Sequence, residues 1–137
     1  MYNDECVSKV KKFSISKIGE NDDENKDSVD FNKNNCVFCI SDGVSGASYS
    51  RDWSKLIVSN FIKNPFETNN IELSSWLGPI QLEWYNLVPW EKLQEMDVNF
   101  LQKAQNGASA TFLGGRILEI EKQIILKLWA IGDSNLF

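Results

Sequence analysis

The chain has 137 residues with 42% apolar and 12% aromatic side chains, a composition typical of one globular domain and not of a disordered protein. Its formal net charge of −5 argues against nucleic acid or an anionic membrane as a partner. The sequence contains no histidine, which excludes Ser-His-Asp and Cys-His nucleophiles and histidine-bound zinc or iron. An enzyme of this composition would depend on carboxylates and a metal ion.

No apolar run approaches the roughly 18 residues needed to span a bilayer, and the first residues lack the features of a signal peptide. With three cysteines, an odd number, we expect a cytoplasmic, reduced protein. Cys36 and Cys39 form a CxxC pair, but the sequence has no second CxxC and no histidine to complete a zinc site. The pair is therefore predicted to be two buried thiols.

Hydrophobic patterning predicts strands over 10–18, 27–31 and 36–41, and an acidic loop over 19–25. The polar turn between the second and third strands indicates that they pair as a hairpin. This hairpin would bring Asp27, at the far end of one strand, close to Asp42, at the far end of the other. Two carboxylates side by side are unfavourable unless a cation lies between them.

Asp42 and Gly43 directly follow the apolar strand 36–41. A rigid strand fixes the direction of the carboxylate, and glycine lets the backbone approach a ligand closely, so its carbonyl oxygen can also bind. This layout suits a hard divalent cation held by oxygen atoms. The other interpretation is a turn that ends the strand, since Asp-Gly is a common turn sequence. By itself the pair leaves both interpretations open.

The second half of the chain is predicted to contain helices over 48–63, 71–87 and 89–104, a strand over 107–120 and a last strand over 124–131. Gly114-Gly115 permits a bulge or bend in the first of these strands. The last strand is almost wholly apolar and is predicted to be buried on both faces. Tryptophan-rich stripes on the second and third helices are predicted to be packing faces. Strands on both sides of a helical block favour an α+β fold.

Several blocks resemble, in order, the motifs of the metal-dependent protein phosphatase 2C family. They are 25–28 (Asn-Lys-Asp-Ser), 38–44 (Phe-Cys-Ile-Ser-Asp-Gly-Val), and 107–111 with 131–134 (Gly-Ala-Ser-Ala-Thr and Ile-Gly-Asp-Ser). The stretch from Trp76-Leu77-Gly78-Pro79 to Trp84 is also similar to a divergent bacterial branch of these phosphatases. The match covers nearly all of this chain but only the first half or so of the family domain.

The resemblance implies a layered α/β/β/α sandwich that hydrolyses phosphoserine and phosphothreonine in phosphoproteins. It makes Asp27, Asp42 and the Gly43 carbonyl group ligands of Mg²⁺ or Mn²⁺, with two ions expected in the complete domain. It makes Asp133 a candidate ligand of an additional, weaker metal. A water that bridges the two ions would attack phosphorus in line, because the ions lower the pKa of that water.

The chain also departs from the family pattern. Lys26 stands where many members carry glutamate, and 22–24 (Asp-Asp-Glu) stand where a phosphate-binding arginine is usual. Arg51 is the candidate substitute, although a surface salt bridge is the commoner role for such a residue. Because the sequence stops at Phe137, we expect 1–137 to be a single, truncated domain that binds metal weakly and is inactive alone.

Three hypotheses follow. The first is the N-terminal part of a 2C-like phosphoprotein phosphatase, active as the full-length protein. The second is a non-catalytic relative, a regulatory or binding module that keeps the fold without the active site. The third is an unrelated α+β domain whose acidic turns are only turns.

Overall fold

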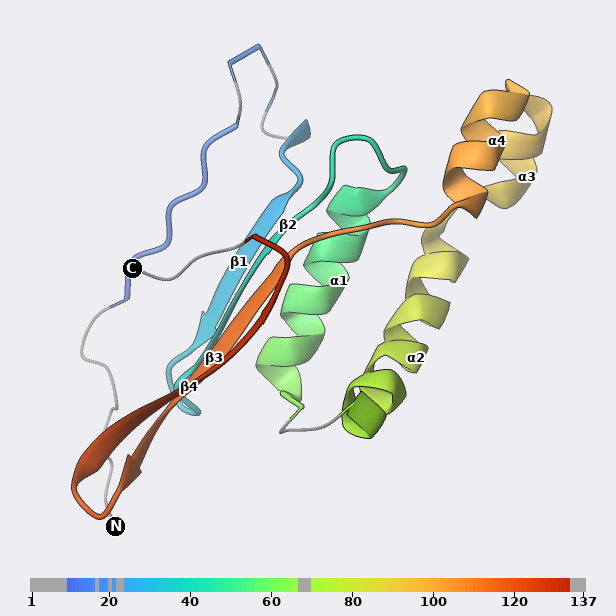
Figure 1. The fold of residues 1–137 in the computed structure, drawn as a ribbon. Coiled ribbons are helices and arrows are strands. Elements are labelled where there is room, and N and C mark those ends of the chain that lie inside the picture. Colours follow the sequence, from blue (N-terminus) through green and yellow to red (C-terminus); the bar gives the residue numbers. More distant parts are fainter. Residues whose placement is uncertain (1–9, 17, 20, 22–23, 67–69, 134–137) are drawn as a thin grey trace.

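A computed structural model of the chain describes residues 10–16, 18–19, 21, 24–66 and 70–133. Its elements are β1 (Asp27–Asn32), β2 (Val37–Asp42), α1 (Ser50–Lys63), α2 (Asn70–Leu87), α3 (Trp90–Glu95), α4 (Val98–Gln105), β3 (Phe112–Ile120) and β4 (Gln123–Ile131). The strands form one antiparallel sheet in the order β1-β2-β3-β4, and α1 packs beside it with α2 next to α1 (Figure 1). The predicted α+β class is confirmed.

The first two strands pair as the predicted hairpin. Asp27 lies opposite Asp42 at one end of the pair, and Asn32 lies opposite Val37 at the other. The polar turn between them ends at Cys36, whose positive φ of 52° reverses the chain into β2. The register therefore places both carboxylates at the same edge of the sheet.

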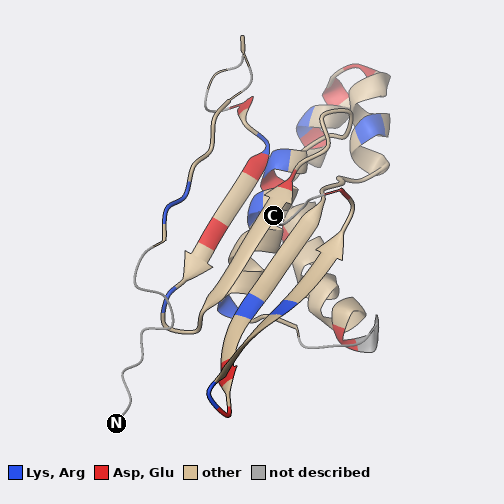
Figure 2. Cartoon of the chain, turned by 60° about the vertical axis from the view of Figure 1, so that its left-hand side comes forward, with Lys and Arg blue, Asp and Glu red and all other residues tan. Residues whose placement is uncertain are grey.

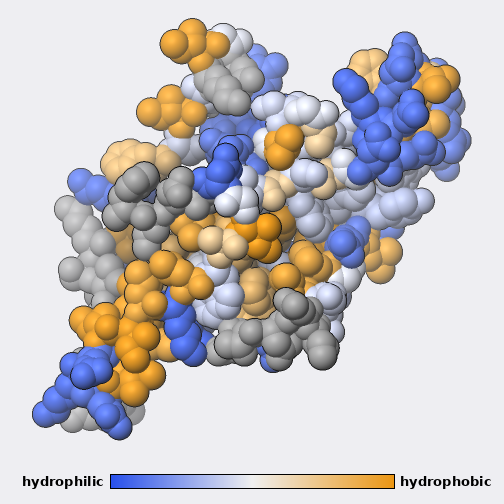
Figure 3. Space-filling model, in the orientation of Figure 1, coloured by the Kyte–Doolittle hydropathy of each residue, from blue (hydrophilic) through white to orange (hydrophobic). Residues whose placement is uncertain are grey.

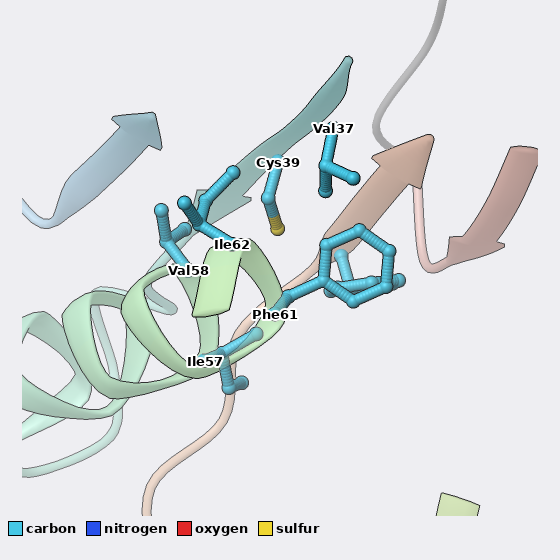
Figure 4. Packing of buried hydrophobic residues seen from close by; sticks show 7 residues of the cluster. Val37, Cys39, Ile57, Val58, Phe61 and Ile62 are labelled. Carbon is cyan, nitrogen blue, oxygen red and sulfur yellow. The ribbon is translucent and has the colours of Figure 1, made fainter. Parts of the chain in front are cut away.

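Alternate residues of β2 face α1 and form the core. Val37, Cys39 and Ser41 are fully buried, whereas Ile40 and Asp42 are exposed on the other face of the strand. The buried cluster comprises Val37, Cys39, Ile57, Val58, Phe61, Ile62 and Phe112 (Figure 4). Partners in an antiparallel pair point to the same face, so both acidic side chains lie on the sheet face opposite α1.

The helical block differs from the prediction at one point. The third helix, predicted over 89–104, is two helices, because Asp97 caps a new one. The Asp97 side chain accepts a hydrogen bond from the backbone N–H of Asn99 at 2.8 Å. Ile80 and Trp84 of α2 are buried against residues of α1, α3 and α4, which confirms the predicted packing face. No described helix has the length and apolar character needed to cross a membrane.

The strand predicted over 10–18 is wrong for its described residues, which form neither strand nor helix, and residue 17 lies outside them. Phe13 and Ile15 are 80% and 87% exposed, so the loose apolar alternation marks no buried face. An ion pair of 2.7 Å between Lys12 Nζ and Asp30 Oδ1 joins the segment to β1. This contact from Lys12 lowers the pKa of the Asp30 carboxyl group.

β4 is an exposed strand at the end of the sheet, so the prediction that 124–131 is buried on both faces is wrong. Only Lys127 and Trp129 are even half-buried in it, and Trp129 packs its ring 5.9 Å from that of Phe61. Exposed apolar side chains gather over the β3–β4 hairpin: Ile120, Ile124, Ile125, Leu126 and Leu128 (Figure 3). An apolar sequence does not reveal whether another element covers the strand.

The bulge that Gly114-Gly115 would permit is not formed, because the pairing with β4 runs without interruption from Phe112 to Ile120. The two glycines serve close packing instead. A Cβ atom on Gly114 would lie 2.5 Å from the ring of Phe112 and 2.7 Å from that of Phe61.

Cys39 is a free, buried thiol, and burial raises its pKa to about 12. Cys36 is disulfide-bonded, so the prediction of two thiols is wrong for this residue. Since Cys39 is free, the two cysteines are not bonded to each other, and the CxxC pair is not a redox disulfide.

Turning the molecule shows the four strands with the helices behind them and few charged residues along the strands (Figure 2). The described residues thus contribute a sheet layer and a helical layer. The expected α/β/β/α layering stays a prediction.

Candidate metal centre

Asp27 and Asp42 face each other across the β1–β2 pair at a position where the two backbones are not bonded to one another. The Asp27 N–H donates to the side chain of Asn25, and the Asp42 N–H donates to the side chain of Thr111. In a non-hydrogen-bonded pair the Cα atoms are about 4.5 Å apart and the side chains approach more closely than in a bonded pair. The hairpin therefore brings the two carboxylates together, as the sequence predicted.

Thr111 fixes the end of β2. Its backbone N–H donates to the Asp42 carbonyl oxygen at 2.8 Å, and its hydroxyl group accepts from the Asp42 N–H at 3.1 Å. The buried hydroxyl of Ser41 donates to the Thr111 carbonyl oxygen at 2.7 Å. These three bonds hold the Asp42 backbone from the side of β3.

The start of β1 is held in a similar way. The Lys26 carbonyl oxygen accepts from the Gly43 N–H at 3.2 Å and from the Ser54 hydroxyl at 2.6 Å. The amide oxygen of Asn25 accepts the Asp27 N–H at 3.0 Å, which forms an Asx-type turn directly before the strand. Both acidic residues are therefore positioned by bonds on each side of the strand pair.

A small pocket of about 20 Å³ lies between these segments. Its lining residues are Ile15, Asn25, Lys26, Asp27, Asp42, Gly43 and Ser45. A volume of this kind is close to the roughly 10–15 Å³ that a single water needs. The pocket is thus of a size for one small ion or one water, and both acidic residues are among those that line it.

Gly43 supplies a third oxygen atom. Among the described residues, no hydrogen-bond donor contacts its carbonyl oxygen. The residue must be glycine, because an added Cβ would lie 2.7 Å from the Ser50 carbonyl oxygen and 2.9 Å from that of Lys26. Glycine thus lets α1 and β1 approach each other closely at the site.

Lys26 also lines the pocket and brings a positive charge to it. Its Nζ atom donates to the carbonyl oxygen of Ser45 at 3.3 Å, so the side chain extends from β1 to the loop that follows β2. The described residues that line the pocket therefore include two acidic residues and one basic residue.

The other predicted site residues lie elsewhere. Asp133 is exposed, two residues beyond Ile131, and Ile131 pairs with Phe112 of β3. Asp133 is at the same edge of the sheet as Asp42 but is separated from it by β3, about 10 Å away at the usual strand spacing. Arg51 is half-buried in the first turn of α1 and is not among the residues that line the pocket.

The donor set fits one hard divalent cation. Two carboxylates and one carbonyl oxygen are the ligands that Mg²⁺ or Mn²⁺ prefers, and water would complete the six positions. Among the described residues there is no group of three or more acidic or cysteine side chains that could hold a metal ion. The number of ions that the complete domain would hold stays a prediction.

No protein-family model, curated protein or solved structure matches this chain. The resemblance to the phosphatase 2C motifs thus rests on the residues of the chain itself. Membership of that family stays a prediction.

Ser54 and Thr111 hydrogen-bond to the backbone of Lys26 and Asp42 and so fix the two strand ends at the site. No role in the site was predicted for either residue. Thr111 closes a block of small residues just before a strand, and a hydroxyl residue there is a usable signal for bonding to a neighbouring strand end. Ser54 carries no such signal, because it is one polar residue on an amphipathic helix. Its partner, the Lys26 carbonyl oxygen, is 28 positions away.

Proposed function

We propose that the pocket between Asp27, Asp42 and Gly43 binds a divalent cation, Mg²⁺ or Mn²⁺. We further propose that the chain is part of a metal-dependent phosphoprotein phosphatase of the 2C type. The observation that carries this proposal is the placement of Asp27 directly opposite Asp42, with both residues lining one ion-sized pocket. Phosphoserine and phosphothreonine proteins are the proposed substrates.

A divalent ion bound here would lower the pKa of a coordinated water and neutralise charge on phosphoryl oxygens. The residues of this chain would hold and orient that ion. The exposed Asp42 carboxylate and its partner Asp27 supply charge, while the bonds from Thr111 and Asn25 fix the backbone from which each carboxylate extends. Hydrolysis through two ions would need further donors beyond these two carboxylates and one carbonyl oxygen.

The second candidate function is a non-catalytic module that keeps the fold. The positive charge of Lys26 in the pocket wall favours it, because this charge opposes a divalent ion. Under this alternative the hairpin and helix would serve binding to a protein partner. A cytoplasmic location stays a prediction, and the disulfide at Cys36 is an observation against a fully reduced chain.

Titration with Mn²⁺ tests the proposal, with free Mn²⁺ followed by electron paramagnetic resonance. We expect weak binding by the wild-type chain and loss of at least tenfold in affinity in Asp42→Asn and in Asp27→Asn, since each removes one charged ligand. Glu121→Gln is the matched control. It removes a carboxylate in the turn between β3 and β4, at the end of that hairpin opposite to the candidate site. Equal Mn²⁺ affinity in Asp42→Asn and Glu121→Gln would contradict the cation site.

Hydrolysis of p-nitrophenyl phosphate in the presence of Mn²⁺ separates the two candidates. If the phosphatase proposal is right, a longer chain that also supplies the remaining metal ligands should hydrolyse this substrate. Asp42→Asn should then abolish the hydrolysis. Mn²⁺ binding with no turnover in such a chain would favour the non-catalytic module.

A further inference from the structure

The two edges of the sheet differ in how they are protected. β1 forms one edge, and its Asp30 is joined to Lys12 of the preceding segment by an ion pair of 2.7 Å. β4 forms the other edge, and in the described part of the chain only β3 pairs with it. Proteins protect edge strands with charges, prolines or bulges. The nine residues of β4 include no proline and a single charge, Lys127, and the strand pairs with β3 without a bulge.

Alternate residues of β4 place apolar side chains on the face of the sheet opposite α1. Trp129 packs against Phe61 of α1, so the odd-numbered residues of the strand are on the helix side. The even-numbered residues are on the opposite face, and all of them are apolar and exposed: Ile124, Leu126, Leu128 and Ala130. Apolar side chains gather over this hairpin on the surface of the molecule (Figure 3). This face of β4 thus carries no charge that would oppose a neighbouring strand.

The exposed apolar surface of β4 is large enough for a specific interface. Five of its apolar side chains are between 36% and 80% exposed: Ile124, Ile125, Leu126, Leu128 and Ile131. Together they expose on the order of 500 Å² per chain, which is in the range of the functional patches of single chains. If two copies met through this strand, they would bury on the order of 1,000 Å² in total, the lower limit for a specific interface.

We propose that β4 pairs antiparallel with β4 of a second copy of this chain, around a twofold axis that joins the two four-stranded sheets into one. The edge backbone groups of β4 would then find hydrogen-bonding partners in the other copy. A twofold axis is closed, so the open edge is used once and the assembly stops at a dimer. The inference does not depend on the proposed cation site, which lies on β1 and β2.

The sequence of β4 selects one register for this pairing. If the axis passed beside Lys127, the lysines of the two copies would lie directly opposite each other, which is unfavourable. An axis beside Leu126 avoids this contact. It places Leu126 opposite Leu126 of the second copy and Ile124 opposite Leu128 of the second copy, so apolar residues meet along the whole exposed face.

Sedimentation velocity over a range of protein concentrations tests the dimer. An interface of this size predicts a dissociation constant on the order of 10 μM. Leu126→Lys should weaken the dimer by about tenfold or more, because two lysines would then meet at the axis. Leu82→Lys is the matched control, since it makes the same change at an exposed leucine of α2 and should leave dimer formation unchanged. Circular dichroism checks that each variant is folded.

Disulfide cross-linking tests the register without placing a charge in the interface. Under oxidation, Leu126→Cys should form a covalent dimer, because directly opposite residues of an antiparallel pair are close enough for a disulfide bond. Leu128→Cys is the control on the same face of the same strand. Its two copies would be four residues out of step, about 13 Å apart, and should not cross-link.

Each outcome either supports or overturns the proposal. A wild-type chain that stays monomeric well above the expected dissociation constant overturns it, and a different partner would then have to cover β4. A dimer that Leu126→Lys and Leu82→Lys affect equally uses another surface, which also overturns it. A mass that rises beyond the dimer excludes the twofold axis, and cross-linking of Leu128→Cys in place of Leu126→Cys overturns the register.

Discussion

The hydroxyl group of Ser54 donates to the backbone carbonyl oxygen of Lys26 at 2.6 Å, across 28 positions of the sequence. Ser54 lies on α1 and is fully buried, and Lys26 directly precedes the acidic end of β1. The helix therefore fixes the strand end that carries Asp27. The candidate site is positioned by the helical layer as well as by the sheet.

Ser54→Ala should destabilise the chain by about 0.5–1.5 kcal/mol, because the Lys26 carbonyl oxygen loses the short hydrogen bond from Ser54 and keeps only the one from the Gly43 N–H. It should also weaken Mn²⁺ binding, since the start of β1 is less well fixed. Urea unfolding and Mn²⁺ titration measure the two effects. Ser59→Ala is the control on the same helix, where the hydroxyl bonds only to the carbonyl oxygen of Leu56 one turn earlier. Equal losses in the two variants would show that the contact with Lys26 contributes nothing beyond the helix itself.

Gly43→Ala is expected to cost about 1–3 kcal/mol in the free energy of unfolding, which is typical of overpacking. The added Cβ would meet backbone atoms, the carbonyl oxygens of Ser50 and Lys26, and these cannot rotate away as a side chain does. Because the strand ends must separate to admit it, Mn²⁺ affinity should fall in parallel. Gly46→Ala lies three residues further on, in open space, and should leave both quantities nearly unchanged. A stable Gly43→Ala variant with wild-type Mn²⁺ affinity would contradict the close approach of α1 and β1.

The local sequence was sufficient to predict the part of the candidate site that the β1–β2 hairpin forms. The length of the turn fixes the register of β1 and β2, and the register places Asp27 opposite Asp42. Contacts between distant segments could not be predicted in this way. The reach of the Lys26 side chain to Ser45 depends on where the loop after β2 turns, and the chain gives no local signal for that turn.

The differences between the predicted and the observed fold have a common cause. A local sequence pattern does not show which other segments of the chain pack against it. The segment 124–131 is apolar enough for a central strand, but β4 lies at the end of the strand order and stays exposed. Gly114-Gly115 indicates by its sequence only that a bulge or bend is permitted, whereas the rings of Phe61 and Phe112 explain the need for glycine at position 114. The missed helix break at Asp97 has a different cause. An aspartate followed by helical residues is a recognisable local cap, and the prediction of one helix over 89–104 overlooked it.

Gly114→Ala tests the packing role of this glycine. The new methyl group would press against the rings of Phe61 and Phe112 in the main core, so we expect a loss of about 1–3 kcal/mol in the free energy of unfolding. Gly78→Ala makes the same chemical change inside α2, where an added Cβ meets no atom, and should stabilise the chain by up to about 1 kcal/mol. Denaturant unfolding of the two variants should therefore give shifts of opposite sign. A Gly114→Ala variant as stable as wild type would mean that the rings move aside without cost.

Cys39 provides a test of the core through pH. Burial raises the pKa of its thiol to about 12, above the ordinary value of a cysteine in an unfolded chain, so the folded state favours the neutral thiol. The resulting stability is complete below the unfolded pKa of about 8.5 and is lost as the pH rises from there toward 12. Cys39→Ala removes this group, so its unfolding free energy should decline less steeply over that range than that of the wild-type chain.

Alkylation measures the same property directly. Iodoacetamide reacts with the thiolate, so at mildly alkaline pH Cys39 should stay unmodified in the native chain and become modified once denaturant is added. Mass spectrometry of the peptide that contains Cys39 identifies the modified residue. Rapid modification of Cys39 in the native chain would place this thiol at the surface, and the contact between β2 and α1 would then be wrong.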